Sequence, residues 1–338
     1  MSELPPPQDV SVTVMIPPYP KLTPDLNKLA DTVFLQRGTI TAAPQEGFTL
    51  VVNYPNDGDK PREERLYPGM LFDAGCKFIT AIQEDPMLST VVSGRPTFKQ
   101  IWDTNPTFRE ALIAQKDPRD FGKWALRKPF NYVIPSLFIP CVARSFYEQF
   151  ALMVGKPDGG LRVLDPCSGW GDRLTGAYCS NVVSDYVSCD PNSALYQGYG
   201  LIKQLCGARN PKMRATMIMQ GFEVAAPLLA DGTFDVVFTS PPFFDYEVYS
   251  EQNPKYTNWE AEFYEPLVNH ALRLVHANGV VAFHIDDTTA GKVPHAIRSR
   301  AVEKFAVDVG FGKRKITVWV IRPGMRESER KRPRPTDA

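Results

Sequence analysis

The chain has 338 residues, of which 43% are hydrophobic and 22% charged, a balance typical of a globular protein that buries a sizeable core. Lysine and arginine together number 38, as do aspartate and glutamate, so the formal net charge is zero and the chain as a whole has no strong basic field. The 6 cysteines are scattered without a Cys-x-x-Cys pair, which argues against a zinc site and against a disulfide framework. Because the chain also has only 4 histidines, we expect no bound metal.

The sequence has no run of about 18 uncharged apolar residues, so we expect no membrane span. The opening segment is acidic and rich in proline, and it lacks the basic-then-apolar order of a signal peptide. These features indicate a soluble protein inside the cell.

The first 125 residues predict short elements, with a strand at 48–54 and a helix near 107–114. Apolar residues at helical spacing predict a longer helix over 137–153. We interpret residues 1–125 as an N-terminal accessory region that would contribute target recognition.

Beyond this helix, short apolar runs alternate with helix-like stretches up to about residue 322. Strands that are apolar throughout and alternate with helices are typical of a mainly parallel sheet covered by helices on both faces. The basic segment 323–338 is interpreted as a disordered tail. The predicted strands are Arg162–Leu164, Tyr186–Cys189, Thr216–Met219, Asp235–Thr239, Gly279–Ile285 and Lys315–Ile321.

The segment that joins the first strand of this sheet to its helix contains Asp165, Gly169 and Gly171. In doubly wound sheets, ligands bind at the carboxyl ends of the strands, and the two glycines allow a tight turn and a close approach to a ligand. A carboxylate at Asp165 would repel a pyrophosphate but suits a cofactor with a positively charged amino group. Arg173 is expected to pair locally or to cap the cleft.

Asp190 ends the second strand, where a carboxylate can accept hydrogen bonds from both hydroxyls of a ribose. The alternative is that Asp190 caps the following helix. After the third strand, Gln220 to Glu223 would contact the edge of an adenine, with Phe222 flanking the ring. The alternative there is a plain turn with a phenylalanine in the core.

The fourth strand ends in Ser240-Pro241-Pro242-Phe243, where two prolines remove two backbone donors. The Ser240 hydroxyl and the Pro241 carbonyl can accept hydrogens from an exocyclic amine and so favour its attack on a methyl group. Phe243 offers a flat face on which an extruded base can stack. We expect this corner and the glycine loop to open into one cleft. The alternative is a strand that simply ends at two prolines beside a core aromatic residue.

These residues together resemble the class I methyltransferases that modify amino groups, whose signature is [Asp/Asn/Ser]-Pro-Pro-[Tyr/Phe/Trp]. The resemblance covers about residues 130–322, and the strings PCSGWGDRL and SPPFFDYEVY resemble DNA modification methylases of phages and large viruses. It implies a Rossmann-like α/β domain over 126–322 with a mainly parallel seven-stranded sheet. It also implies the cofactor S-adenosylmethionine, held by Pro135, Ser136, Phe138, Asp165, Cys167, Ser168, Gly169, Gly171, Asp190, Gln220, Phe222 and Glu223.

The function that the resemblance implies is methyl transfer to N4 of cytosine or N6 of adenine. The leading Ser240 tilts this choice toward cytosine, and the partner would be DNA rather than RNA, in the cytoplasm or nucleus of a host cell. Two other readings stay open, a catalytically idle subunit of a larger nucleic-acid-processing assembly and an enzyme that methylates glutamine in proteins.

Overall fold

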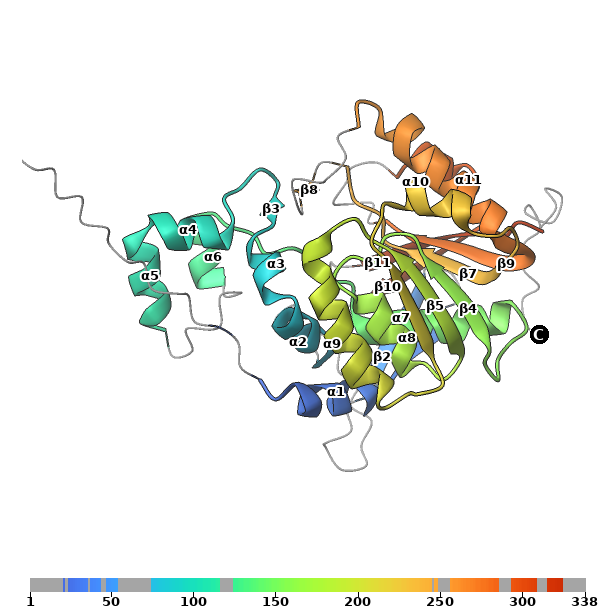
Figure 1. The fold of residues 1–338 in the computed structure, drawn as a ribbon, viewed down its shortest axis with the longest axis horizontal. Helices are drawn as coiled ribbons and strands as arrows, with labels where there is room; N and C mark the ends of the chain where they lie inside the picture. Colours follow the sequence, from blue (N-terminus) through green and yellow to red (C-terminus); the bar gives the residue numbers. More distant parts are fainter. Residues whose placement is uncertain are drawn as a thin grey trace, which may run out of the picture.

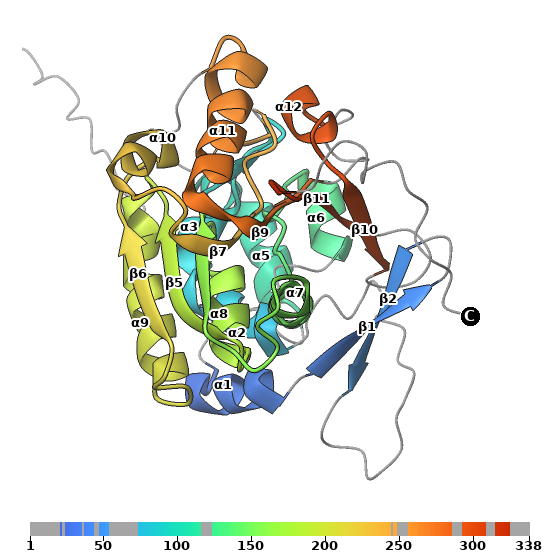
Figure 2. The same ribbon diagram turned by 90° about the vertical axis from the view of Figure 1, so that its right-hand side faces the viewer.

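The computed structural model describes residues 21, 24–35, 37–43, 47–53, 74–115, 124–244, 246–248, 256–285, 293–308 and 315–324. These residues form a β-sheet covered by helices and a smaller helical lobe that projects from one side (Figure 1). After a turn of 90° the sheet is seen between its two layers of helices (Figure 2). The tail predicted at 323–338 lies outside the described residues from 325 onward.

The described strands of the main sheet number nine, and their spatial order differs from their order in the chain. In that spatial order they are β1 (Arg37–Ala43), β2 (Gly47–Asn53), β10 (Glu303–Asp308), β11 (Lys315–Ile321), β9 (Val275–His284), β7 (Phe234–Thr239), β4 (Leu161–Asp165), β5 (Val183–Cys189) and β6 (Arg214–Ile218).

The seven strands from β10 to β6 form the mainly parallel sheet that the sequence predicts. Strands β9, β7, β4, β5 and β6 run parallel, whereas β11 is antiparallel to both β9 and β10. This order and these directions are those of the class I methyltransferase fold, so the predicted fold class is confirmed. All six strands named from the sequence are present, and β10 is the seventh, which the sequence reading did not name.

The hairpin of β1 and β2 extends the sheet beyond those seven strands. Strand β2 confirms the strand predicted at 48–54, whereas neither β1 nor the place of the hairpin in this sheet was predicted. Strand β2 pairs parallel to β10, with Phe48 opposite Val307 and Thr49 opposite Asp308. A segment from the first 125 residues therefore belongs to the same sheet as the glycine loop. The boundary at residue 125 stays a prediction.

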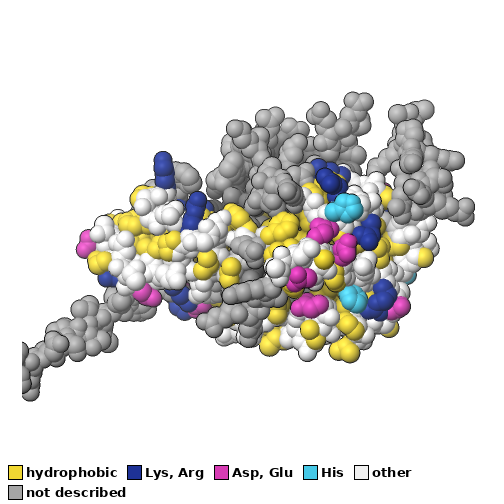
Figure 3. Space-filling model, turned by 90° about the horizontal axis from the view of Figure 1, so that it is seen from above, with side chains coloured by type: hydrophobic (Ala, Val, Ile, Leu, Met, Phe, Trp, Pro, Cys, Tyr) yellow, Lys and Arg dark blue, Asp and Glu magenta, His cyan; other side chains and the backbone are white. Residues whose placement is uncertain are grey.

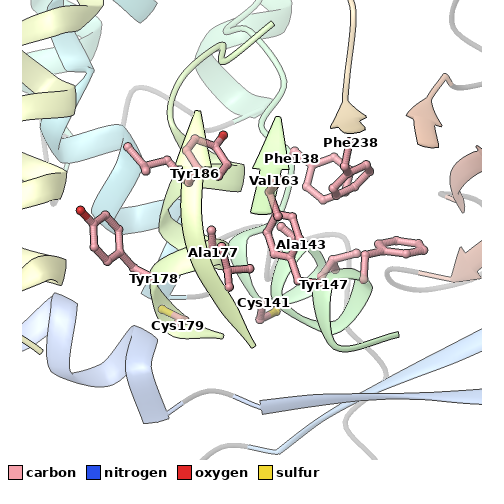
Figure 4. Close-up of a cluster of buried hydrophobic side chains, with 14 of the residues drawn as sticks. Phe138, Cys141, Ala143, Tyr147, Val163, Ala177, Tyr178, Cys179, Tyr186 and Phe238 are labelled. Carbon is pink, nitrogen blue, oxygen red and sulfur yellow. The ribbon is translucent and has the colours of Figure 1, made fainter. Parts of the chain in front are cut away.

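Two buried clusters pack the two faces of the sheet. Successive strand residues point to opposite faces, so Val163 lies in the cluster with helices α1, α2, α7, α8 and α9, while Leu164 lies in the cluster with α10, α11 and α12. Figure 4 shows part of the first cluster, where Tyr147 of α7 and Phe238 of β7 pack with ring centroids 5.7 Å apart. The helices of the sheet region are α1 (Leu26–Leu35), α2 (Ala74–Ile82), α3 (Glu84–Leu88), α7 (Pro140–Met153), α8 (Asp172–Cys179), α9 (Tyr196–Gly207), α10 (Phe222–Ala225), α11 (Glu265–Leu274) and α12 (His295–Arg298), with the shorter turns η2 (Ser193–Leu195), η3 (Ala226–Leu228) and the π-helix η4 (Glu260–Tyr264).

The projecting lobe contains α4 (Phe98–Thr104), α5 (Pro106–Ile113) and α6 (Trp124–Phe130) (Figure 1). Thr97 begins α4 with a capping box, since its hydroxyl accepts from the Gln100 amide at 3.1 Å and the Gln100 side chain accepts from the Thr97 amide at 2.8 Å. Phe98, Phe108 and Tyr132 meet edge to face inside the lobe. The lobe thus has a small core of its own. Among the described residues no helix is both long and apolar enough to cross a membrane.

Candidate active site at the carboxyl edge of the sheet

The glycine loop between β4 and α8 depends on backbone conformations that side chains disfavour. Gly169 has a φ of 57° and Gly171 a φ of 91°, both in the left-handed region. A Cβ on Gly171 would lie 2.6 Å from Cδ1 of Ile202, so α9 packs directly on this position. The left-handed turn therefore favours glycine at 171, and any side chain there would also displace the end of the Ile202 side chain.

Asp165 is fully buried, and its carboxylate is already occupied within the protein. It accepts from Arg173 Nε at 2.9 Å, from the Tyr186 hydroxyl at 2.6 Å and from the Cys167 amide at 3.3 Å. Burial alone would lower the pKa of Arg173, but the charge of Asp165, its hydrogen bond to Arg173 and the neighbouring Tyr186 and Tyr147 together outweigh burial and raise that pKa. The local pairing expected of Arg173 is confirmed. A direct contact between Asp165 and a cofactor amino group stays a prediction, and it would need this ion pair to open.

Asp190, at the end of β5, connects two loops. Its carboxylate accepts from the Gly169 amide and from the Asn192 amide, each at 2.9 Å. Burial raises the pKa of Asp190 to about 6, although both backbone hydrogen bonds act in the opposite direction. A carboxylate has about four acceptor positions, so two remain for the hydroxyls of a ribose. The cap of the next helical turn is Asn192, whose side chain accepts from the Ala194 amide at 3.2 Å.

The residues after β6 divide into buried and exposed ones. Phe222 is 4% exposed and packs edge to face against His270, with ring centroids 6.1 Å apart. Phe222 therefore lies in the core, as in the alternative of a plain turn followed by a core phenylalanine. Gln220 and Glu223 are exposed beside it, and their contact with an adenine stays a prediction.

The double-proline corner lies directly beside the glycine loop. Strands β4 and β7 are parallel neighbours, with Val163 opposite Val236, so their carboxyl ends meet at one edge. At that edge the Thr239 hydroxyl accepts from the Cys167 amide at 3.0 Å and donates to the Cys167 carbonyl at 3.4 Å. The two segments therefore lie at the same edge of the sheet, as a shared cleft requires, and the cleft itself stays a prediction.

Tyr264 of the π-helix η4 contacts the double-proline corner. The buried Tyr264 hydroxyl donates to the Pro242 carbonyl at 2.7 Å, and its ring packs against Phe244 with centroids 5.3 Å apart. Phe244 has a φ of 53°, which is unusual for a residue with a side chain and turns the chain sharply. Ser240 and Phe243 are half-buried, and the Phe243 ring meets His284 edge on at 6.0 Å.

The segment before α7, which contains the expected cofactor contacts Pro135, Ser136 and Phe138, lies at the same edge. The ring centroid of Phe138 lies 5.7 Å from that of Phe238 and 5.1 Å from that of His284. Phe238 is the second-last residue of β7, and His284 is the last residue of β9. Pro135 is buried, and the exposed Ser136 donates its amide to the Glu247 carboxylate at 3.4 Å. The sequence-predicted site residues thus gather at one edge, and their individual roles stay predictions.

Three residues that hold this site together carry no clear local signal in the sequence. Thr239 reads as an ordinary strand residue, and Tyr264 lies in an aromatic-rich stretch whose partner in the fold is not visible from its spacing. Gln83 belongs to the region interpreted as accessory, yet it contacts the glycine loop. No group of three or more histidine, cysteine, aspartate or glutamate side chains within the described ranges is arranged to hold a metal ion.

Comparisons with known proteins give structural likeness only. No protein-family model matches the chain, and no curated protein sequence matches it. Among solved structures, a putative RNA methyltransferase from Pyrococcus horikoshii is similar at 13% identity and a TM-score of 0.33, over 53% of this chain and 79% of that one.

Two further solved structures have the same kind of likeness. A spermidine synthase from Thermotoga maritima is similar at 15% identity and a TM-score of 0.37, over 56% of this chain and 62% of that one. A SAM-dependent methyltransferase from Thiobacillus denitrificans, in complex with S-adenosyl-L-homocysteine, is similar at 18% identity and a TM-score of 0.28, over 41% of this chain and 48% of that one. This chain covers less than two thirds of either of these two proteins.

Proposed function

We propose that this protein transfers a methyl group from S-adenosylmethionine to an exocyclic amino group of a nucleic-acid base. The observation that carries the proposal is the junction at Thr239, which joins the glycine loop after β4 to the double-proline corner after β7. A cofactor over the first loop and an amine beside the second would then be neighbours at the same edge of the sheet.

The residues at the glycine loop fit a nucleoside cofactor. Asp190 is buried, positioned by two backbone amides, and retains acceptor capacity for ribose hydroxyls. Gly169 and Gly171 keep the loop backbone free of side chains where a ligand would approach. When bound, S-adenosylmethionine supplies a methyl group that is already activated by its sulfonium.

The residues at the corner would act on the target base. The Ser240 hydroxyl and the Pro241 carbonyl would accept the two hydrogens of the amine, which draws its lone pair out of conjugation with the ring. Tyr264 occupies the Pro242 carbonyl and so fixes the loop that presents these two acceptors. Phe243 would stack against the target base once the base is extruded from the nucleic-acid duplex.

We propose DNA as the partner rather than RNA, with N4 of cytosine or N6 of adenine as the methylated atom. The face of the molecule in Figure 3 presents no single basic field among the described residues. In Figure 3 the lysine and arginine side chains of the described residues are scattered over the helical lobe and the sheet region, with acidic side chains among them. The phosphates would therefore be contacted at local positions.

The proposal is tested with S-adenosylmethionine carrying a labelled methyl group, incubated with duplex DNA, single-stranded DNA, RNA and a pool of cellular proteins. We expect label in DNA, at least tenfold less label with Ser240→Ala or Phe243→Ala, and unchanged cofactor affinity in both variants. Ser299→Ala, an exposed serine on the turn after α12, is the matched control and should label DNA as the wild type does.

Other outcomes contradict the proposal in distinct ways. Label in protein alone would indicate a glutamine methyltransferase. No label in any pool, from a folded protein, would indicate an idle subunit.

A further inference from the structure

Gln83 is a buried polar residue from the N-terminal region that reaches into the glycine loop. It lies between α2 and α3 and is 1% exposed. Its backbone amide donates to the Ile79 carbonyl at 2.8 Å, and its carbonyl accepts from the Met87 amide at 3.0 Å. The two helices on either side therefore fix the backbone from which its side chain extends.

The Gln83 side chain connects the two loops that flank Asp190. Its Nε2 donates to the Trp170 carbonyl at 3.3 Å, in the loop after β4, and to the Leu195 carbonyl at 3.2 Å, in the turn η2 after β5. Without this donor, the Trp170 and Leu195 carbonyls would each lose one hydrogen bond. One side-chain amide thus joins the two loops at the ribose site, which Asp190 also connects.

Helix α9 has a glycine, Gly198, where the Gln83 amide packs against it. A Cβ on Gly198 would lie 2.4 Å from Gln83 Nε2, so any larger residue there displaces the side chain. Gly200, two residues along the same helix, has no atom within 4 Å of the corresponding position. Gly198→Ala should therefore displace the Gln83 amide without changing Gln83 itself, and Gly200→Ala is its control.

The segment that begins at Gln83 also reaches the chemical corner. Strand β3 (Val91–Val92) pairs antiparallel with β8 (Glu247–Val248), shortly after the double proline. The amide of Ser93 donates to the Tyr246 carbonyl at 2.7 Å. Residues 83–93 therefore contact both halves of the site.

We propose that Gln83 is a positioning residue for the cofactor site, so that the N-terminal region takes part in cofactor binding in addition to any recognition of the target. The inference rests on the proposed function, because the ligand it concerns is the nucleoside cofactor. Gln83 acts through the Trp170 and Leu195 carbonyls and does not itself contact the cofactor.

The first experiment measures the Kd of S-adenosylhomocysteine by calorimetry on the full-length wild type, Gln83→Met, Gly198→Ala and Gly200→Ala. We expect Gln83→Met and Gly198→Ala each to raise Kd about 5- to 30-fold, which corresponds to the loss of about 1–2 kcal/mol. The double variant should bind about as the single ones do, since both changes remove the same contact. Gly200→Ala should bind as the wild type.

The second experiment needs no cofactor and follows amide hydrogen exchange in the unliganded proteins. Gln83→Met should speed exchange in the loop at 168–171 and in the turn at 193–196, while β9 keeps its protection. A purely structural role would instead change global stability and leave Kd unchanged in the folded protein.

The outcomes separate the two proposals. Wild-type binding with unaltered Kd in both Gln83→Met and Gly198→Ala, and unaltered exchange in the two loops, would overturn the positioning role alone. A folded wild type that does not bind S-adenosylhomocysteine would overturn the proposed function and the inference together.

Discussion

Asp190 is a carboxylate on which burial and hydrogen bonding act in opposite directions. Burial prevails and raises its pKa from the usual 3.8 to about 6. The folded protein therefore binds more protons than the unfolded chain between these two values. It follows that the contribution of Asp190 to stability decreases as the pH rises through this window and is constant above about pH 6.

The same titration predicts a pH dependence of cofactor affinity. Ribose hydroxyls donate to the ionised carboxylate, so the Kd of S-adenosylhomocysteine should rise below pH 6, by at most about tenfold per pH unit. Asp190→Asn should bind more weakly at pH 8 and show no such slope. Calorimetry from pH 5 to pH 8 checks this, and an equally steep slope in the variant would rule out Asp190 as its source.

Asp165 and Gln83 show which features of the site could be predicted from the sequence and which could not. The strand-end aspartate, the glycines and the double proline were visible because each depends on its own local sequence. The local pairing of Arg173 was predicted as well, but the hydrogen bond from Tyr186 to Asp165 was not, since Tyr186 comes from the neighbouring strand. Gln83 is harder still, because the carbonyls it contacts are 87 and 112 positions away in the chain.

At the scale of elements, the π-helix η4 and the double-proline corner form one unit through Tyr264. Tyr264→Phe keeps the ring against Phe244 and removes only the hydroxyl that binds the Pro242 carbonyl. We expect a loss of about 1 kcal/mol in the free energy of unfolding and a several-fold fall in kcat, with the Kd of the cofactor unchanged. Steady-state kinetics on the base substrate would check this, and an unchanged kcat would contradict the role assigned to Tyr264.

Asp235 ties several elements together at the opposite end of the strands. It accepts from Lys156 Nζ, from the Arg162 amide and from His276 Nε2, each at 2.8 Å. Burial by itself would raise the pKa of Asp235, but these three partners lower it below its usual value. The stability that they contribute is therefore present above about pH 4 and is lost as the pH falls through the lowered pKa.

Asp235→Ala should lower the free energy of unfolding by about 1–3 kcal/mol at pH 7, because it leaves three donors without their acceptor. The matched control is Asp231→Ala, whose exposed pair with Arg273 should contribute at most about 1 kcal/mol. Urea denaturation of both variants gives the comparison. Equal losses would show that the buried network adds nothing beyond a surface ion pair.

The strands that the sequence missed differ physically from those it predicted. The central strands are buried on both faces and read as apolar runs. Strand β10 (Glu303–Asp308) mixes charged and apolar residues near the edge of the seven-stranded sheet, so its pattern is weak. The hairpin of β1 and β2 is recognisable only in part, because its pairing with β10 joins segments far apart in the chain.

At the scale of the whole molecule, helices α1 and α2 of the N-terminal region contribute to the core that covers one face of the sheet. Ala30 of α1 and both Phe78 and Ile79 of α2 are fully buried in the cluster that covers one face of the sheet. We therefore expect a fragment that begins at residue 126 to be unstable, since the loss of each large buried side chain costs about 2–5 kcal/mol against a total of about 5–15.

Circular dichroism and urea denaturation of this fragment, beside the full chain, check the expectation. A cooperative unfolding transition of the fragment with the stability of the full chain would contradict it. That result would agree with the interpretation of residues 1–125 as an accessory region.

The most direct measurement of the account's central claim is mass spectrometry of nucleosides after incubation of the full chain with DNA, RNA and S-adenosylmethionine carrying a deuterated methyl group. The account predicts labelled N4-methylcytosine or N6-methyladenine in the DNA digest, and at least tenfold less of it with Ser240→Ala. Label confined to a ring carbon, as in 5-methylcytosine, would contradict the claim, as would a folded protein that leaves every nucleoside unlabelled.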